Sequence, residues 1–168
     1  LAERNITVRQ INLKDYKNEV EKILKVYNDA WIENTGFIPM TDTEFKYLAK
    51  DLKMILDKDF CMVAEHEGKS IGFALAIPDI NQTLIKIKRG RLLPTGMFKL
   101  LLGKKKINYV RVIALGVDKE YRRAGIEAFF YGEIIQQAIN KKLKGGEASW
   151  ILENNEMMNK GLIKMNAK

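Results

Sequence analysis

Apolar side chains alternate or recur along this chain in the patterns of strands and helices. Residues 6–11 alternate between apolar and polar types, which predicts a first strand. Asp15 is a suitable N-cap for a helix over residues 16–31, where apolar side chains recur at helical spacing. Thr41 and Glu44 resemble a capping box, and the apolar positions after them predict a second helix.

The middle of the chain predicts a hairpin and then a central strand. Residues 60–65 and 70–77 are apolar, β-prone runs, and the polar stretch 66–69 between them is a hairpin signal. Residues 109–117 are rich in β-branched side chains and predict the central strand.

Residues 79–106 are the least regular part of the pattern. Pro78 stops the strand before them, and one short helix is expected around residues 96–102. Because the stretch is too long for an idle connection, it predicts an insertion with a role of its own.

The last part of the chain predicts a helix, a strand and a final helix. A helix over residues 125–142 is expected to end at Gly145 and Gly146. Residues 148–152 then predict a strand, and residues 155–165 a helix. The buried face of the first of these helices is expected to consist of Ile126, Phe129, Phe130, Ile134 and Ala138.

These elements predict one α/β domain over residues 1–168, long enough to bury roughly two-thirds of its unfolded surface. The single cysteine, Cys61, excludes an internal disulfide framework and fits a reducing compartment. No apolar run reaches about 18 residues and no signal-type segment begins the sequence, so a cytoplasmic protein is expected. The first residue is not Met, and we expect the chain to be a fragment.

Positive charge is concentrated in the irregular stretch. The net charge is +8, and no acidic residue occurs from Ile80 to Lys106. Such a segment can attract the phosphates of a cofactor, an acidic substrate, nucleic acid or an anionic membrane, or it can be a solvated basic loop. Its basic residues are Lys86, Lys88, Arg89, Arg91, Lys99, Lys104, Lys105 and Lys106.

The segment from Val110 to Phe130 has the features of a phosphate-binding turn. The strand ends at Val117, a polar turn follows, and Gly125 opens a helix. The first N–H groups of a helix have no intrahelical partner, and the helix dipole favours negative charge there. A glycine at the start has no Cβ to obstruct a ligand.

This segment resembles the acetyl-CoA-binding motif of the GCN5-related N-acetyltransferase (GNAT) superfamily, Arg/Gln-x-x-Gly-x-Gly/Ala after a strand. Arg122 and Gly125 match the motif, whereas Glu127 stands at its third, small position. The stretch from Ala30 to Thr41 also looks like part of a less characterised acetyltransferase-like subgroup.

The resemblance implies the GNAT acyl-CoA N-acyltransferase fold, an α/β (α+β) architecture with a mixed central sheet flanked by helices. The final C-terminal strand or strands of that fold are absent from the predicted order. The implied enzyme is an N-acetyltransferase that moves an acyl group from acetyl-CoA or another acyl-CoA to an amine of a small molecule or peptide. No metal, nucleic acid or membrane is implied as a partner, and a homodimer is allowed.

The resemblance also implies which residues hold the cofactor. Backbone groups at the end of the central strand would hold the pantetheine, and those of the turn and helix start would hold the pyrophosphate. The Arg122 and Arg123 side chains either attract phosphate or are solvated loop charges. Asn155 is the polar group after the fifth strand, or simply an N-cap. The implied cofactor-binding residues are Leu115, Gly116, Val117, Arg122, Arg123, Ala124, Gly125, Ile126, Glu127, Ala128 and Asn155.

Catalytic groups are less evident than binding groups. Leu162 occupies the place of the tyrosine that often protonates the departing thiolate, so Tyr109, Tyr121 or water would have to substitute. Glu33 and Glu153 are candidates for the general base, although each can be an ordinary polar residue. The candidates for the acceptor pocket are Trp31, Asn34 and Phe37, of which the aromatic residues can equally be core.

Two other function classes fit parts of the sequence. Glu127 would compete with a pyrophosphate for the helix N–H groups and repel it, so the domain can be a degenerate GNAT-fold sensor or binding module. Alternatively, the basic stretch binds nucleic acid or a membrane surface, unless its leucines cover an acyl pocket. His66 is expected to be exposed and Cys61 to be a buried, inert thiol.

Overall fold

A five-stranded mixed sheet forms the middle layer of the computed structural model. The structure describes residues 1–33, 36–87, 95–149, 151, 153 and 155–165. The strands lie side by side in chain order, with antiparallel pairs up to the fourth strand and a parallel pair at the end. They are β1 (Ile6–Gln10), β2 (Cys61–His66), β3 (Lys69–Pro78), β4 (Tyr109–Val117) and β5 (Gly145–Ala148).

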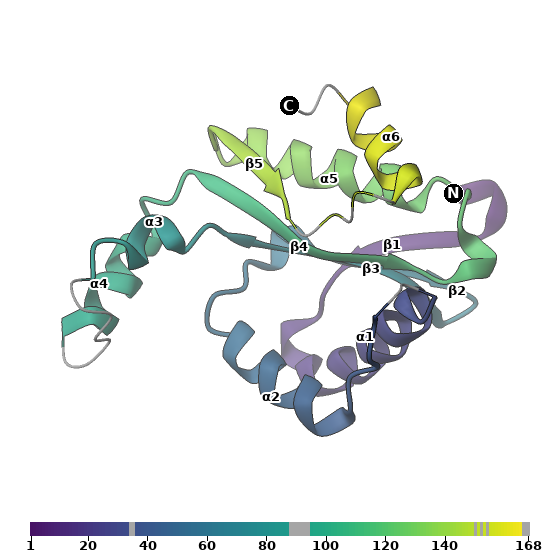
Figure 1. Ribbon diagram of the computed structural model, residues 1–168, viewed down its shortest axis with the longest axis horizontal. Helices are drawn as coiled ribbons and strands as arrows, with labels where there is room; N and C mark the ends of the chain where they lie inside the picture. The colour runs from purple at the N-terminus through teal and green to yellow at the C-terminus, as the bar shows by residue number, and fades with distance from the viewer. Residues whose placement is uncertain (34–35, 88–94, 150, 152, 154, 166–168) are drawn as a thin grey trace.

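Helices cover both faces of the sheet, as Figure 1 shows. One face carries α1 (Tyr16–Trp31) and α2 (Asp42–Leu52), and the other carries α5 (Ile126–Asn140) and α6 (Glu156–Lys164). The helices α3 (Asn81–Leu84) and α4 (Thr95–Lys104) lie beyond one end of the sheet. The predicted α/β class, the mixed sheet and the predicted order of elements are therefore confirmed.

Two local signals in the sequence have the predicted structural effect. Glu67 and Gly68 both have positive φ, at 49° and 78°, which is the conformation of a two-residue hairpin turn between β2 and β3. At the start of α2, the Glu44 N–H donates to Thr41 Oγ1 at 3.3 Å, and the Thr41 N–H donates to Glu44 Oε2 at 3.0 Å. The hairpin and the capping box are both confirmed.

The predicted end of α5 and the predicted position of the fifth strand are wrong. Gly145 and Gly146 do not terminate the helix, because they are the first residues of β5 and pair with Tyr109 and Val110. A Cβ on Gly145 would lie 3.0 Å from the Tyr109 ring, so glycine permits the close approach of β5 to β4. The helix ends at Asn140 instead. Of the predicted strand 148–152, Trp150 and Leu152 lie outside the described residues.

The predicted buried face of α5 is also wrong at one position. Phe129 is 41% exposed, whereas Ile126, Phe130 and Ile134 are buried together with Tyr131. The buried residues recur every four positions, and Phe129 lies to one side of that stripe. The aromatic residue that the sequence analysis did not include, Tyr131, faces the sheet instead.

A β-bulge changes the side-chain alternation of β4. Leu75 pairs with Ala114 and the next residue, Ala76, pairs with Val112, which leaves Ile113 without a partner on β3. As a result, Val110 and Val112 before the bulge and Leu115 and Val117 after it belong to the same buried cluster as α5. The bulge thus keeps one apolar face toward α5 along the whole strand.

Gly116 is required for close packing and does not mark the bulge. It lies opposite Phe73, and a Cβ there would be 3.0 Å from the Phe73 ring and 3.1 Å from the Ala30 Cβ. Glycine therefore lets the end of α1 settle against β4. The structure thus gives Gly116 a packing role.

We expect Gly116→Ala to lower the free energy of unfolding by about 1–2 kcal/mol, because both neighbours of the new methyl group are packed and buried. Urea unfolding would measure this. Gly132→Ala in α5 is the matched control, since no atom lies within 4 Å of its Cβ. That variant should be neutral or more stable, and equal stabilities of the two variants would contradict the packing role of Gly116.

Candidate functional site

The two last strands of the sheet diverge soon after they pair. β4 pairs with β5 only from Tyr109 to Val112, and the Ser149 N–H makes a final bond of 3.1 Å to the Val112 carbonyl. Beyond that point, no described strand pairs with β4 on this side, from Ile113 to Val117. The result is a strand edge whose backbone groups can accept a ligand as an added strand.

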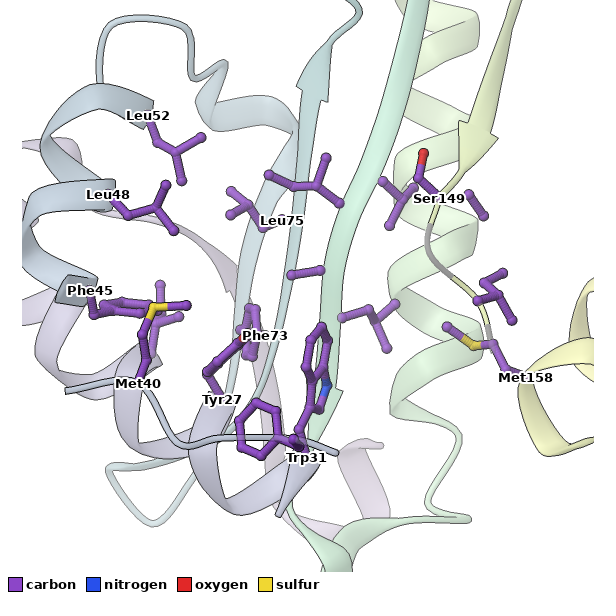
Figure 2. Close-up of a pocket in the computed structure, with 18 of the residues that line it drawn as sticks. Tyr27, Trp31, Met40, Phe45, Leu48, Leu52, Phe73, Leu75, Ser149 and Met158 are labelled. Carbon is purple, nitrogen blue, oxygen red and sulfur yellow. The ribbon is translucent and has the colours of Figure 1, made fainter. Parts of the chain in front are cut away.

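A cavity of about 570 Å³ opens where the strands diverge. In Figure 2, side chains of α1, α2 and β3 lie on one side of β4, and Ser149 and Met158 lie on the other. The cavity thus reaches both faces of the sheet. Its lining includes Tyr27, Trp31, Phe37, Met40, Phe45, Leu48, Leu52, Phe73, Leu75, Ile113, Ala114, Leu115, Tyr131, Ser149, Asn155 and Met158.

The described lining of this cavity carries no charged side chain. Its aromatic part is a cluster around Tyr27, whose ring centroid lies 4.6 Å from that of Trp31 and 5.6 Å from that of Phe37. Burial raises the pKa of the Tyr27 hydroxyl. A polycationic ligand would lose its hydration here without gaining a counter-charge, whereas an apolar chain fits.

Two of the three predicted acceptor-pocket residues, Trp31 and Phe37, line the cavity. The third, Asn34, lies outside the described residues. The sequence analysis missed Phe45 and Leu48 of α2 and Phe73 of β3 as lining residues. Their apolar periodicity predicts a face turned inward, but it does not distinguish a packed core from a cavity wall.

The loop between β4 and α5 has the backbone conformation of an anion site. Arg123 and Gly125 have positive φ, at 72° and 83°, and no atom lies within 4 Å of a Cβ on Gly125. The Phe129 N–H donates to the Gly125 carbonyl at 3.0 Å and makes the first intrahelical hydrogen bond of α5. The N–H groups of residues 126–128 come before it and have no acceptor within the helix. These N–H groups and the helix dipole together favour a phosphate at this end of α5.

The Arg122 side chain points to α1. Its Nη2 donates to the Ala30 carbonyl at 2.7 Å, near the C-terminal end of α1, and its Nη1 lies 3.2 Å from a Glu33 carboxylate oxygen. The Lys119 Nζ lies 2.6 Å from the other oxygen of Glu33. Arg122 therefore ties the loop to the end of α1, which leaves the backbone of the loop as the source of donors for an anion.

The structure does not favour Glu33 as a general base. The hydrogen bond from Lys119, with its charge and that of Arg122, lowers the pKa of the Glu33 carboxyl. A general base works best with a pKa near the working pH, and a carboxylate held by two cations is a weaker proton acceptor. Glu33 also does not line the cavity.

Glu127 lies one helical turn before Tyr131, on the side of α5 that bears the cavity. The described residues offer its carboxylate no hydrogen bond or ion pair. Burial raises the pKa of the Tyr131 hydroxyl to about 12, and the Glu127 charge adds to this effect. Because Glu127 lies in the first turn of α5, its negative charge would oppose a pyrophosphate at the helix start.

The remaining catalytic candidates lie away from the cavity. Tyr109 starts β4, at the end of the strand far from the loop, and packs against Gly145. The Tyr121 hydroxyl lies 2.9 Å from His66 Nδ1, which makes His66 half-buried and contradicts its expected exposure. Glu153 is exposed. None of these residues lines the cavity.

The other predicted residues have structural partners. Asn155 lines the cavity and also caps α6, because its side-chain oxygen accepts from the Met158 N–H at 3.2 Å. Leu162 packs against the buried cluster of α5 and the sheet. Cys61 is buried as expected, and burial raises the pKa of its thiol to about 12. Among the described residues, no group of three or more His, Cys, Asp or Glu side chains could hold a metal ion.

Solved structures of similar fold are acetyltransferases. The aminoglycoside acetyltransferase AAC(6')-Iy, in complex with a CoA bisubstrate analogue, has a TM-score of 0.62, with 97% of this chain and 90% of that chain covered at 14% identity. An N-acetyltransferase from Staphylococcus aureus Mu50 also has a TM-score of 0.62, with 96% and 82% covered at 23% identity. The chain has the GNAT fold. The resemblance expected from the loop motif is thereby confirmed at the level of fold.

Two curated proteins are similar in sequence over most of this GNAT-fold chain. The "Bacterial ceramide synthase" of Caulobacter vibrioides (strain NA1000 / CB15N) is 32% identical over 159 residues, which are 91% of this chain and 41% of that protein. "Protein YghO" of Escherichia coli (strain K12) is 31% identical over 171 residues, with 98% and 44% covered. The chain spans less than half the length of these relatives. No family model matches it.

We expect Glu127→Gln to tighten CoA binding about two- to fivefold at low salt, because it removes a negative charge from the first turn of α5. Calorimetric titration with CoA would measure this, and the gain should shrink as salt is added. Glu133→Gln is the matched control, since it makes the same change about 9 Å further along the same helix. Unchanged or weaker binding by Glu127→Gln would remove the electrostatic objection to this loop.

Proposed function

We propose that this domain is an N-acyltransferase that moves an acyl group from an acyl-CoA directly to an amine. One observation carries the proposal: the unpaired edge of β4 opens on an apolar cavity, with an anion-binding loop at the end of the same strand. The GNAT fold supports it, and structures of that fold include complexes with CoA and with a CoA bisubstrate analogue.

In this proposal the backbone binds most of the cofactor. Leu115, Gly116 and Val117 lie on the part of β4 that pairs with β3 but not with β5. They would hold the pantetheine through backbone N–H and C=O groups.

The N–H groups of residues 126–128 would hold the pyrophosphate, where the positive φ of Gly125 opens the loop. The Arg122 and Ala124 N–H groups, which the sequence also suggested for this role, donate instead to the carbonyls of Lys119 and Tyr121. Asn155 lines the cavity, and because its side-chain oxygen caps α6, its NH2 group would be the donor left for the cofactor.

The reaction needs one proton donor and one proton acceptor. The amine nitrogen attacks the thioester carbon, the C–S bond breaks, an amide forms, the ammonium loses a proton and the CoA thiolate gains one. We assign the donor role to Tyr131, which lines the cavity and whose pKa of about 12 keeps it protonated at neutral pH. Leu162, at the position usual for the donor, has no proton to give.

The proposed substrates carry long apolar chains. An acceptor such as the aminoglycoside sisomicin, which is bound in one structure of similar fold, would enter a cavity whose described lining has no carboxylate. An acyl chain or the tail of a lipid amine would find apolar walls from α1, α2 and β3. One relative of this chain bears the name of a ceramide synthase, which agrees with a lipid amine as acceptor.

A second candidate is a binding module that holds an acyl-CoA without turnover. Glu127 at the helix start and Leu162 in place of a donor favour it. The two candidates differ in one measurable respect, because only an enzyme releases free CoA thiol when both an acyl-CoA and an amine are present.

We expect a long-chain acyl-CoA to release thiol when a long-chain amino alcohol is the acceptor. With the aminoglycoside sisomicin as the acceptor, little thiol should be released. Ala114→Leu would add bulk to the cavity lining and should lower kcat/KM for the long-chain acyl-CoA about tenfold or more, while acetyl-CoA turnover changes less. Ala2→Leu, the same change at an exposed position outside the cavity, is the control. CoA binding without thiol release across all pairs would identify a binding module, and absence of CoA binding would refute the site itself.

We expect Tyr131→Phe to lower kcat about a hundredfold with little change in CoA affinity, because the ring and its packing remain and the proton donor is lost. Thiol-release kinetics and calorimetry would separate the two effects. Tyr27→Phe is the matched control, since it removes the hydroxyl of a second, half-buried tyrosine that lines the same cavity. A loss with Tyr27→Phe and none with Tyr131→Phe would transfer the donor role to Tyr27.

A further inference from the structure

The insertion of residues 79–106 does not serve the cavity. None of its described residues lines the cavity, so its described leucines, Leu84, Leu100, Leu101 and Leu102, do not form the pocket lid that the sequence suggested. Figure 1 shows α3 and α4 beyond the end of the sheet, away from α1 and α2. A different role must explain why this segment is both apolar and basic.

One face of α4 packs against α3 through glycines. Gly103 lies so close to Thr83 of α3 that a Cβ there would collide with the threonine side chain. Gly96, two turns earlier on the same face, is also buried, and Thr83 is only 5% exposed. The Lys104 Nζ donates to the Leu56 carbonyl at 3.3 Å and links α4 to the body of the domain. These contacts fix which side of α4 is turned outward.

The outward side of α4 carries three large apolar side chains. Phe98, Leu101 and Leu102 are 69%, 59% and 71% exposed. Their spacing of three and four residues places them together on one face, opposite Gly96 and Gly103. Three such residues side by side on a single short helix form a patch rather than scattered exposed positions.

Lysines border this apolar patch, and the sequence of the insertion contributes no acidic residue to it. Lys99, Lys105 and Lys106 are exposed at or just after α4, and the sequence has no Asp or Glu from Ile80 to Lys106. A ligand for this surface must therefore bind apolar side chains and neighbouring cations at the same time. Nucleic acid offers phosphates for the lysines but would leave the apolar side chains in water.

We propose that α4 docks on the surface of an anionic lipid bilayer. Phe98, Leu101 and Leu102 enter the boundary between headgroups and acyl chains, while the lysines extend to the anionic headgroups. This is attachment to a surface: no described helix is both long and apolar enough to cross a bilayer. The docking does not depend on the proposed acyl transfer.

Flotation of the full chain with vesicles tests the docking. We expect it to bind vesicles of mixed phosphatidylglycerol and phosphatidylcholine at low salt, and to bind pure phosphatidylcholine vesicles more weakly. The variant Phe98→Gln, Leu101→Gln, Leu102→Gln should lower the partition coefficient at least about tenfold. The matched control is Ile139→Gln with Ile163→Gln, two positions that are 63% and 70% exposed on α5 and α6.

The charge of the surface is tested separately. Lys99→Gln, Lys105→Gln, Lys106→Gln should weaken binding to anionic vesicles, whereas Lys14→Gln, Lys17→Gln, Lys50→Gln, with the same loss of charge, should not. Melting temperatures would show that all variants fold. Absence of vesicle binding at low salt, equal losses in test and control variants, or full binding by the apolar triple variant would overturn the proposal. Salt-dependent binding to duplex DNA with no vesicle binding would instead assign the surface to nucleic acid.

Discussion

The short pairing between β4 and β5 is the constraint on which the candidate site depends. β4 pairs with β3 along nearly its whole length, but with β5 only as far as Val112. Longer pairing would consume the backbone groups from Ile113 to Val117 and close the gap through which the cavity crosses the sheet. The site therefore exists because hydrogen bonding of the sheet is left incomplete at one edge.

Two features of β4 make that incomplete edge compatible with a packed domain. The bulge at Ile113 keeps Leu115 and Val117 in the cluster with α5, so the strand stays anchored on that face without β5. On the other face, Gly116 admits Phe73 and the end of α1 at distances that a side chain would forbid. Strand β4 is thus held by β3 and two helices where its fifth-strand partner is missing.

Local signals in the sequence predicted local structure, and long-range contacts decided the rest. The turn at Glu67 and Gly68 and the capping box at Thr41 depend on neighbouring residues, and both are readable from the sequence. The sequence pattern predicted that Gly145 ends a helix. Glycine is required there because the position packs against the Tyr109 ring, which is distant in the sequence. Likewise, the partner of Arg122 is Glu33, 89 residues earlier, which no local pattern indicates. The apolar cavity was hidden because its walls have the same periodicity as a core.

The ion pairs of the loop bear on how an anion can bind there. Glu33 already balances Lys119 and Arg122. The pair with Lys119 is solvent-exposed and the pair with Arg122 is partly exposed, so salt screens both and neither contributes much to stability. A pyrophosphate that bound those side chains would have to displace the Glu33 carboxylate. Its net gain in binding free energy would be only the difference between the two interactions. Among the described residues, no carboxylate accepts a hydrogen bond from the N–H groups at the start of α5, and the helix fixes the direction of these groups. Hydrogen bonds from the backbone are therefore a stronger basis for specific anion binding than these side chains. The negative charge of Glu127 is then the main local repulsion that a bound anion meets.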